Sequence, residues 1–411
     1  MTTRTPSSVA LGATSWCELD LNALQHNFDL FASLVGGPSG LLPVIKANAY
    51  GHGLEAVASV LVARGVEQVG VNELAEGLWL RERYPELDII VLGQARHPDI
   101  ETLVSAKLQL VAVREDALRL ASAAAVAHGT IARVHLKLET GAHRQGLSSE
   151  ALLPLARLLR DLPCVEFEGL STHFADIEDT TDPSFARQQL ARFKEGVAAL
   201  AAEGIRPRRL HAANTAATLN MPETRFDLAR VGIGLYGLWP SQETLISAMS
   251  AAMSAGAQGG VSELRPVLSW KTRVVELKTV PAGGYIGYGR SFRATSPLRL
   301  AVLPVGYYDG YDRGLSNLAH VLIRGQRAPL RGRVCMNMCM VDVTDVQGVT
   351  LDDEVVLLGR SGDEQIRAED LASLIGTIHY EVTTRIHERL PRILSDARAV
   401  DPENRAPKGD P

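Results

Sequence analysis

The chain has 411 residues, of which 46% are hydrophobic, so it is long enough for two domains with separate cores. Its 42 basic and 47 acidic residues give a net charge of −5 without a clustered basic run, which argues against nucleic-acid binding. No apolar run approaches the roughly 20 residues of a membrane span, and residues 1–11 lack an apolar secretory core, so we expect a cytoplasmic protein without a membrane segment.

Cysteine and histidine spacing does not predict a metal site. Cys335 and Cys339 are spaced C-x3-C, but no second Cys or His pair follows at zinc spacing. The 11 histidines are scattered, without an H-E-x-x-H pattern. We therefore expect no metal, and reduced thiols at these two cysteines and at Cys17 and Cys164.

The chain begins with one strand and one helix. Residues 14–21 alternate apolar and polar side chains, as a half-buried strand does. Asn22 then caps a helix expected to run to about Val35, because its apolar side chains recur close to helical spacing.

After this helix, short apolar runs alternate with amphipathic segments. Strand followed by helix, repeated, is typical of a parallel sheet. Eight such runs within about 200 residues predict a (β/α)8 barrel. An open doubly wound sheet is the competitor, but no G-x-G-x-x-G follows the first of these strands. The predicted strands are 42–46, 68–71, 88–92, 108–113, 134–138, 167–172, 210–213 and 228–233, and the helices include 54–64, 73–83, 115–127, 150–160 and 185–203.

The pattern changes after Gly237. Residues 241–264 are rich in Ala, Ser, Gly and Met, which predicts either a helix with a loose end or a flexible insertion. From Arg265 onward, short alternating runs separated by turns predict a mainly-β domain. These runs are 270–278, 298–305, 320–323, 340–343 and 355–358, with a helix at 368–374.

These patterns predict two domains. The barrel would span 14–240 and the β domain 265–395, with the strand at about 14–20 joining the β domain and 241–264 as a linker or insertion. Residues 1–13 and 401–411 are expected to be disordered.

Lys46 follows directly on an apolar run, Leu42 to Ile45, and precedes a turn with Gly51 and Gly53. Desolvation at the end of a buried strand favours the neutral amine, which is the nucleophilic form and the form that makes a Schiff base. For an isolated lysine, a solvated surface side chain is the more frequent explanation. The residues at the other strand ends therefore have to decide whether Lys46 is a desolvated nucleophile or a solvated surface lysine.

Several further polar groups stand at or after the C-terminal ends of the predicted strands, where barrels carry their active sites. Two lysines and two arginines among them suit an anionic ligand with a phosphate or a carboxylate. Each has a structural alternative: a core histidine for His173, close packing for Gly232 and Gly234, or a costly interior lysine paired with Glu139 for Lys137. The set is Lys46, Lys137, Glu139, His143, Arg144, His173, His211, Asn214, Thr215, Arg230, Gly232 and Gly234.

The predicted β domain adds three candidates. Tyr288 stands between two glycines, Tyr307 lies in an aromatic loop, and Met336 lies in a short turn. An interface or core position is the more common explanation for such aromatic residues.

In chain order, these motifs resemble the bacterial alanine racemase family, pyridoxal-phosphate enzymes of fold type III with a barrel followed by a β domain. The resemblance runs from about Trp16 to Arg392. The motifs that carry it are 44–53, 137–144, 172–174, 214–215, 230–237, 288–289, 306–311 and 333–336.

The resemblance implies interconversion of L-alanine and D-alanine, which supplies D-alanine for peptidoglycan. Lys46 would carry pyridoxal 5′-phosphate covalently and act as one of two bases at the α-carbon. The partner subunit's Tyr288 would act from the opposite face, so a homodimer with shared active sites would be needed. Racemisation requires two such bases, because one removes the α-proton and the other returns one.

The resemblance also implies binding roles. Arg230 would face the pyridine nitrogen and keep it unprotonated, since an arginine does not give up its proton. Arg144 and the backbone N–H of Met336 would bind the substrate carboxylate, Lys137 would be carbamylated, and Tyr307 would narrow the access route. The cofactor would contact Lys46, Tyr50, His173, Asn214, Thr215, Arg230, Gly232 and Ile233.

Four positions depart from the family pattern. Asn337 stands where an aspartate is usual, Thr215 where serine is common, and Glu139 opens a loop that usually starts Asp-Thr-Gly-Met. Glu388 stands where some members carry a tyrosine. These departures keep a serine racemase or a racemase of broader specificity open as alternatives.

Two other pyridoxal-phosphate functions remain as weaker alternatives. Fold type III decarboxylases share the architecture, but the chain shows no counterpart of their glycine-rich phosphate loop. Non-catalytic carriers of the cofactor are single barrels without a β domain, whereas this chain has one that includes Tyr288.

Overall fold

The computed structural model describes residues 13–254 and 263–395. Contacts divide the chain into two units, which we call the β unit (Met1–Ala23, Tyr50–Ala56 and Pro266–Pro411) and the barrel unit (Leu24–Ala49 and Val57–Arg265). The predicted disorder of 1–13 and 401–411 falls, apart from Ala13, outside the described residues.

The barrel unit contains eight parallel strands within its described residues. Strands β3 to β8 form one sheet in chain order, and β2 pairs with β9. A bridge between Val44 and Gly70 connects β2 to β3, and the N–H of Leu228 donates to the carbonyl of Leu210 at 3.2 Å beside β8 and β9. The strands are β2 (Leu41–Pro43), β3 (Gln68–Val71), β4 (Asp88–Gln94), β5 (Gln109–Ala112), β6 (Ala132–Lys137), β7 (Val165–Ser171), β8 (Arg209–His211) and β9 (Ala229–Val231).

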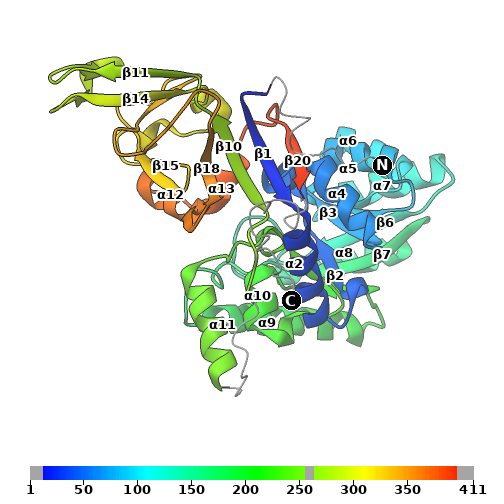
Figure 1. Ribbon diagram of the computed structural model, residues 1–411. Coiled ribbons are helices and arrows are strands. Elements are labelled where there is room, and N and C mark those ends of the chain that lie inside the picture. The colour runs from blue at the N-terminus through cyan, green and yellow to red at the C-terminus, as the bar shows by residue number, and fades with distance from the viewer. Residues whose placement is uncertain (1–12, 255–262, 396–411) are drawn as a thin grey trace, which may run out of the picture. The chain divides into compact units, whose positions relative to one another are not determined.

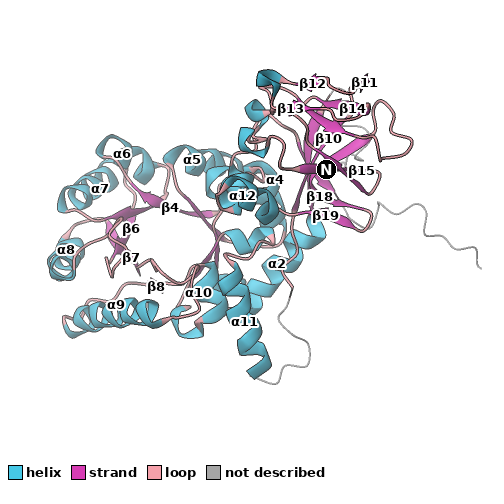
Figure 2. Cartoon of the chain, turned by 90° about the vertical axis from the view of Figure 1, so that its left-hand side faces the viewer, coloured by secondary structure: helices cyan, strands magenta, loops and turns pink. Residues whose placement is uncertain are grey.

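These links close the sheet, so the predicted barrel is confirmed and the open doubly wound sheet is wrong. Figure 2 shows strands β4, β6, β7 and β8 inside a ring that includes helices α5 to α9. The strands β3 and β5 are buried throughout, because helices cover a parallel sheet from outside and side chains fill its interior.

The helices of this part of the chain follow the predicted alternation. Residues 242–254 form a helix, which settles this part of the predicted insertion in favour of a helix. The helices are α2 (Leu21–Leu34), α3 (Lys46–Tyr50), α4 (Leu54–Ala63), α5 (Leu74–Arg83), α6 (His97–Ser105), α7 (Glu115–Ala127), α8 (Ser149–Asp161), α9 (Ser184–Ala202), α10 (Thr215–Asn220) and α11 (Gln242–Ser254).

The β unit is built on a seven-stranded sheet in the order β16-β15-β18-β10-β1-β20, with β19 beside β18. A three-stranded sheet, β11-β14-β17, and the hairpin β12-β13 complete it. Figure 1 shows β11 and β14 of the three-stranded sheet side by side. The elements are β1 (Ser15–Asp20), β10 (Leu268–Arg273), β11 (Glu276–Val280), β12 (Tyr285–Ile286), β13 (Phe292–Arg293), β14 (Leu298–Leu303), β15 (His320–Ile323), β16 (Gln326–Pro329), β17 (Cys339–Asp342), β18 (Glu354–Ser361), β19 (Glu364–Ile366), β20 (Arg392–Ser395), α12 (Ala368–Ile375) and α13 (His379–Thr384).

Segments from both ends of the described chain meet in the large sheet. Strand β1 pairs antiparallel with β10 and parallel with β20. The single strand predicted at 270–278 is wrong, because the chain changes sheets within it. Trp270 pairs with Leu358 in the large sheet, whereas Glu276 pairs with Val302 in the three-stranded sheet.

Two observations concern membranes and thiols. Among the described residues, no helix is long and apolar enough to cross a membrane. All four cysteines are free thiols, two of them buried (Cys17 and Cys339).

Candidate functional site

The chain makes a left-handed turn immediately after Lys46. Ala47, Asn48 and Ala49 have φ of 53–54° and ψ of 46–52°, and Tyr50 has φ of 53°. Each L-residue in this conformation costs about 1–2 kcal/mol, and such strain concentrates at functional sites. The sequence had predicted a turn at Gly51 and Gly53, but the turn starts four residues earlier, in residues that give no glycine signal.

The turn fixes Lys46 at the end of its strand. The N–H of Val44 donates to the carbonyl of Val231 at 2.8 Å, and that of Ile45 to the carbonyl of Gly70 at 2.9 Å. Strand-like hydrogen bonding therefore continues up to Lys46. The Glu76 carboxylate accepts from the N–H groups of Asn72 at 3.0 Å and Glu73 at 3.3 Å and faces the N–H of Asn48 at 3.4 Å.

The environment of Lys46 favours its neutral amine. Burial is the main cause that lowers its pKa, and the nearby cations Arg144 and Arg230 lower it further. Glu76 and Glu178 act in the opposite direction but do not restore the pKa. A half-buried amine of this kind is both a nucleophile and a base.

Arg230 is held rigidly by the backbone. Its Nη2 donates to the carbonyls of Thr172 at 2.7 Å and Ala212 at 2.9 Å, and its Nη1 donates to that of His211 at 2.7 Å. Nδ1 of His173 lies 3.4 Å from Nη2. Burial lowers the pKa of Arg230 to about 10, so the guanidinium keeps its charge at neutral pH.

The loop that follows β6 carries Arg144. Glu139 organises this loop, because its carboxylate accepts from the N–H groups of Gly141 and Ala142, each at 2.6 Å. Lys137, for which Glu139 was the predicted partner, donates to Oε1 of Gln145 at 3.3 Å. Burial, Arg230 and Arg144 lower the pKa of Lys137 to about 8.

Asn214 and Thr215 begin helix α10. Oδ1 of Asn214 accepts from the N–H of Ala217 at 3.0 Å and caps the helix, and its Nδ2 donates to Glu178 at 2.9 Å. Oγ1 of Thr215 accepts from the N–H of Gly232 at 3.2 Å, so these two residues lie together. Ile233 follows Gly232 directly and is buried.

Gly234 is explained by close packing, which was the structural alternative. A Cβ at this position would lie 2.5 Å from the Phe31 ring and 2.6 Å from Cγ2 of Thr215.

The remaining predicted site residues lie in the β unit. Tyr288 is 73% exposed and stands between Gly287 and Gly289, both with positive φ. The N–H of Tyr307 donates to the carbonyl of Cys335 at 3.0 Å, which brings its loop beside Met336, a side chain that is 55% exposed. The ring of Tyr50 lies 6.2 Å from that of Tyr380.

The structure therefore assembles the predicted residues as two groups. Lys46, Lys137, Arg144, His173, Asn214, Thr215, Arg230, Gly232 and Ile233 belong to the barrel unit, and Tyr50, Tyr288, Tyr307 and Met336 to the β unit. Of the positions that depart from the family pattern, Asn337 and Glu388 are exposed.

Sequence reasoning missed four polar residues. Glu76 and Glu178 act electrostatically on Lys46, and His135 and Gln109 are buried inside the barrel. The only available signal was a polar residue within an apolar strand, at Gln109 and His135. Among the described residues, no group of three or more His, Cys, Asp or Glu side chains could hold a metal ion.

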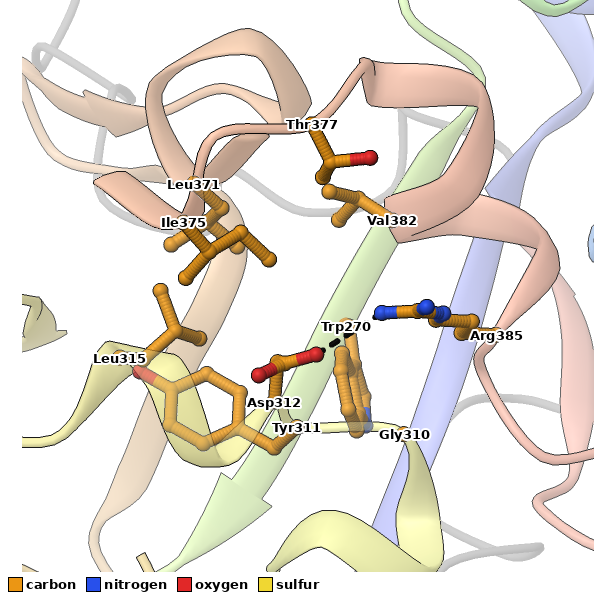
Figure 3. Close-up of a pocket in the computed structure, with 10 residues that line it drawn as sticks. All are labelled: Trp270, Gly310, Tyr311, Asp312, Leu315, Leu371, Ile375, Thr377, Val382 and Arg385. Carbon is orange, nitrogen blue, oxygen red and sulfur yellow. Dashed lines mark hydrogen bonds and ion pairs between the residues drawn. The ribbon is translucent and has the colours of Figure 1, made fainter. Parts of the chain in front are cut away.

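A small pocket in the β unit belongs to neither group (Figure 3). Its lining includes Trp270, Tyr311 and Leu371, and an ion pair joins Asp312 and Arg385 at 2.8 Å. Its volume of about 10 Å³ matches one water molecule, so neither an amino acid nor a cofactor fits.

Comparison with known proteins identifies the relatives of this chain. Residues 19–240 match the family description "Alanine racemase, N-terminal domain", and residues 267–394 match "Alanine racemase, C-terminal domain". The alanine racemase of Leptospira interrogans is 36% identical over 386 residues, which cover 93% of this chain and 96% of the relative. That of Syntrophobacter fumaroxidans is 40% identical over 370 residues, covering 90% and 94%.

Solved structures agree with these sequence matches. An alanine racemase from Clostridium difficile superposes with a TM-score of 0.86 at 29% identity, covering 94% of this chain and 97% of that one. The alanine racemase of Bacillus anthracis with bound L-Ala-P gives a TM-score of 0.84 at 31% identity, covering 94% and 96%.

Proposed function

Because the chain belongs to the alanine racemase family, and is therefore an amino-acid racemase that acts on alanine, we propose that it uses pyridoxal 5′-phosphate and two bases. The bases are Lys46 and the partner subunit's Tyr288. The observation that carries this proposal is the pair of groups in the barrel unit, an amine with a lowered pKa just after β2 and a rigid, buried guanidinium on β9.

The donor set of the barrel unit fits the cofactor. Lys46 supplies the nucleophilic amine that a carbonyl group requires. Thr215 accepts from the N–H of Gly232 at 3.2 Å, which leaves its own hydroxyl proton free to donate to a phosphate. Arg230 offers donors from a fixed position to a ring nitrogen. His173, Asn214 and Ile233 of this unit complete the proposed contacts, together with Tyr50, which we assign to them although it belongs to the β unit.

When bound, the cofactor would withdraw electrons from the substrate's α-carbon and so acidify its proton. The chain's own residues then handle that proton. Nζ of Lys46 holds or releases it on one face, and Oη of the partner subunit's Tyr288 does so on the other. Two bases on opposite faces convert either enantiomer into the other.

The exposure of Tyr288 supports a homodimer with shared active sites. Its ring is 73% exposed within the chain, although a catalytic base has to work in a site that excludes water. A second copy of the chain can supply that enclosure. Tyr307 and Met336 lie in neighbouring loops of the same unit, and we assign them to the access route and to the substrate carboxylate, respectively.

Arg144 binds the substrate carboxylate in this proposal, and Lys137 orients it. A neutral lysine amine reacts with carbon dioxide to give a carbamate and one proton. The pKa of about 8 gives Lys137 a neutral fraction near neutral pH, and the resulting anion would face Arg144 and Arg230, whereas the protonated amine would add a third cation beside them.

Lys137 should make stability depend on pH and on bicarbonate. Its pKa is about 8 in the folded chain against 10.5 ordinarily, so the unfolded state binds more protons between these values. In CO2-free buffer, the free energy of unfolding should therefore gain on the order of 2–3 kcal/mol from this group as pH rises through that window. Adding bicarbonate at pH 8 should also raise the free energy of unfolding, because carbamylation removes the cation. Urea titrations at several pH values measure both effects.

Lys137→Met is the matched control for this prediction. It removes the titrating amine but keeps an unbranched apolar side chain, so both the pH slope and the bicarbonate effect should disappear. A bicarbonate effect of equal size in Lys137→Met would contradict carbamylation of Lys137.

We further propose that the D-alanine formed supplies peptidoglycan and that the enzyme works in the cytoplasm. The location is supported by the four free thiols, two of them buried, which are typical of a reducing compartment.

A racemisation assay over a panel of amino acids, with and without added pyridoxal 5′-phosphate, tests the proposed function. We expect racemisation of alanine that is lost when the cofactor is removed and recovered when it is returned. Undiminished activity in cofactor-free protein would refute the cofactor proposal. Equal racemisation rates for alanine and serine would show broader specificity in place of a preference for alanine.

A further inference from the structure

A chain of buried side chains connects Arg230 to Arg133 through the barrel interior. Nη1 of Arg230 lies 3.1 Å from Nδ1 of His211, and Nε2 of His211 lies 3.0 Å from Nδ1 of His135. Nε2 of His135 lies 2.8 Å from the side-chain amide of Gln109, whose other end faces Arg133. The two histidines and Gln109 are at most 2% exposed, so their partners have to come from the protein.

The fold makes room for these buried side chains, above all for the ring of His135. The register between β6 and β7 shifts beside His135, so that Val134 pairs with Phe167 but His135 pairs with Gly169. A Cβ on Gly169 would lie 2.2 Å from Nδ1 of His135. The rings of His135 and His211 meet edge to face with centroids 5.1 Å apart. A bulge and a glycine thus accommodate the first imidazole.

Both imidazoles are neutral. Burial, reinforced by nearby arginines, lowers the pKa of His135 to about 3 and that of His211 well below its usual value. Each ring therefore carries one N–H and one acceptor nitrogen.

The two ends of this series of side chains cannot both be satisfied by hydrogen bonds, because both are donors. Arg230 and Arg133 can only donate, whereas a neutral imidazole or an amide that accepts on one side has to donate on the other. Four contacts join three such neutral groups to two donor ends. Only three of these contacts can be hydrogen bonds, and one has to bring two donors together.

The surroundings of Gln109 decide where this mismatch falls. With its oxygen toward Arg133, the amide accepts from Nη1 at 3.2 Å and from Nη2 at 2.8 Å, and its nitrogen donates to Nε2 of His135 at 2.8 Å. His135 then donates from Nδ1 to Nε2 of His211. The remaining proton of His211 sits on Nδ1 and faces Nη1 of Arg230, one of whose two N–H groups donates to the carbonyl of His211 at 2.7 Å.

We propose that Gln109 and His135 are positioning residues that act on Arg230 through His211. The amide orientation of Gln109 sets the tautomer of both histidines, so that His211 presents an N–H, and no acceptor, to the guanidinium. Arg230 therefore keeps its donor capacity for a ligand at the barrel mouth. The consequence for catalysis rests on the proposed function, whereas the tautomers do not.

The tautomers can be measured in the wild-type protein. Selective ¹⁵N-histidine labelling and long-range ¹H–¹⁵N correlation spectra distinguish Nδ1–H from Nε2–H, with signals assigned from the variants His135→Gln and His211→Gln. We expect Nδ1–H at both positions, with and without pyridoxal 5′-phosphate. An Nε2–H tautomer at either histidine would overturn the proposal.

Gln109→Glu tests the causal role of the amide. A carboxylate accepts from Arg133 and from His135 together, which allows all four contacts to be hydrogen bonds. Both histidines should switch to Nε2–H, and Arg230 gains an acceptor at His211. Because its donation to the ring nitrogen is then weakened, kcat should fall at least about threefold with KM for alanine unchanged.

The control Gln188→Glu adds the same charge on the exposed surface of α9 and should change neither the histidine tautomers nor kcat. Unchanged tautomers in Gln109→Glu would show that Gln109 does not set the tautomers of the two histidines. A switch of tautomers without a change in kcat would show that the tautomers do not affect catalysis. Failure of the proposed function would appear separately, as wild-type protein without racemase activity.

Discussion

Replacing Lys46 by alanine is expected to lower kcat/KM for alanine by at least about 10⁴-fold and to remove the visible absorbance band of the bound cofactor. The lowered pKa of its amine makes Lys46 the nucleophile that attaches the cofactor, and the same neutral amine is one of the two bases. One substitution therefore removes two functions. Absorbance of the purified variant with added cofactor, together with a coupled racemisation assay, measures both losses.

Lys194→Ala is the matched control, because Lys194 lies exposed on α9 in the same unit. It should keep both the band and the activity. If Lys46→Ala showed the wild-type band, the cofactor would be attached elsewhere and the assignment of Lys46 would fail.

The barrel could be predicted because its strands are short, apolar and separated by amphipathic segments. Strand β3 was predicted at its observed residues, 68–71. The first barrel strand was placed at 42–46, whereas β2 covers Leu41–Pro43; strand-like hydrogen bonds continue through Val44 and Ile45 until the left-handed turn begins at Ala47. Local pattern gives no warning of such a turn, since it is stabilised by the surrounding fold and not by residue preference.

The same limit applies to the candidate site. The sequence singled out Lys46 and Arg230 because each lies on or directly after a recognisable apolar strand. The chain from His211 to Gln109 could not be predicted, because its members come from three strands and meet only when the barrel closes. Gly169 illustrates this point. In the sequence it is one glycine among 36, and only the structure shows that a side chain at this position would collide with the ring of His135 on the neighbouring strand.

Tyr288→Phe is expected to lower racemisation by about 10²- to 10⁴-fold, the usual contribution of a general base. Because the two enantiomers are equal in free energy, kcat/KM has to fall by the same factor in both directions. The asymmetry should instead appear in hydrogen exchange. We assign Tyr288 to the face that carries the α-hydrogen of L-alanine and Lys46 to that of D-alanine. In D2O, the variant should therefore still exchange the α-hydrogen of D-alanine but no longer that of L-alanine, which mass spectrometry of each enantiomer measures.

Tyr285→Phe, at a neighbouring tyrosine that is 50% exposed, should behave as wild type in both experiments. Equal exchange of both enantiomers in Tyr288→Phe would contradict the role of Tyr288 as the base for L-alanine.

Mixing the two inactive variants tests whether Tyr288 acts in the other chain. In a heterodimer of Lys46→Ala and Tyr288→Phe, one site would combine both lesions and the other would carry intact Lys46 and Tyr288. Random reassociation of equal amounts gives one half heterodimers, each with one working site of two, so activity should recover to about a quarter of wild type. Co-purification of differently tagged chains confirms reassociation. If such heterodimers form but stay inactive, Lys46 and Tyr288 have to act within a single chain, and the shared site is excluded.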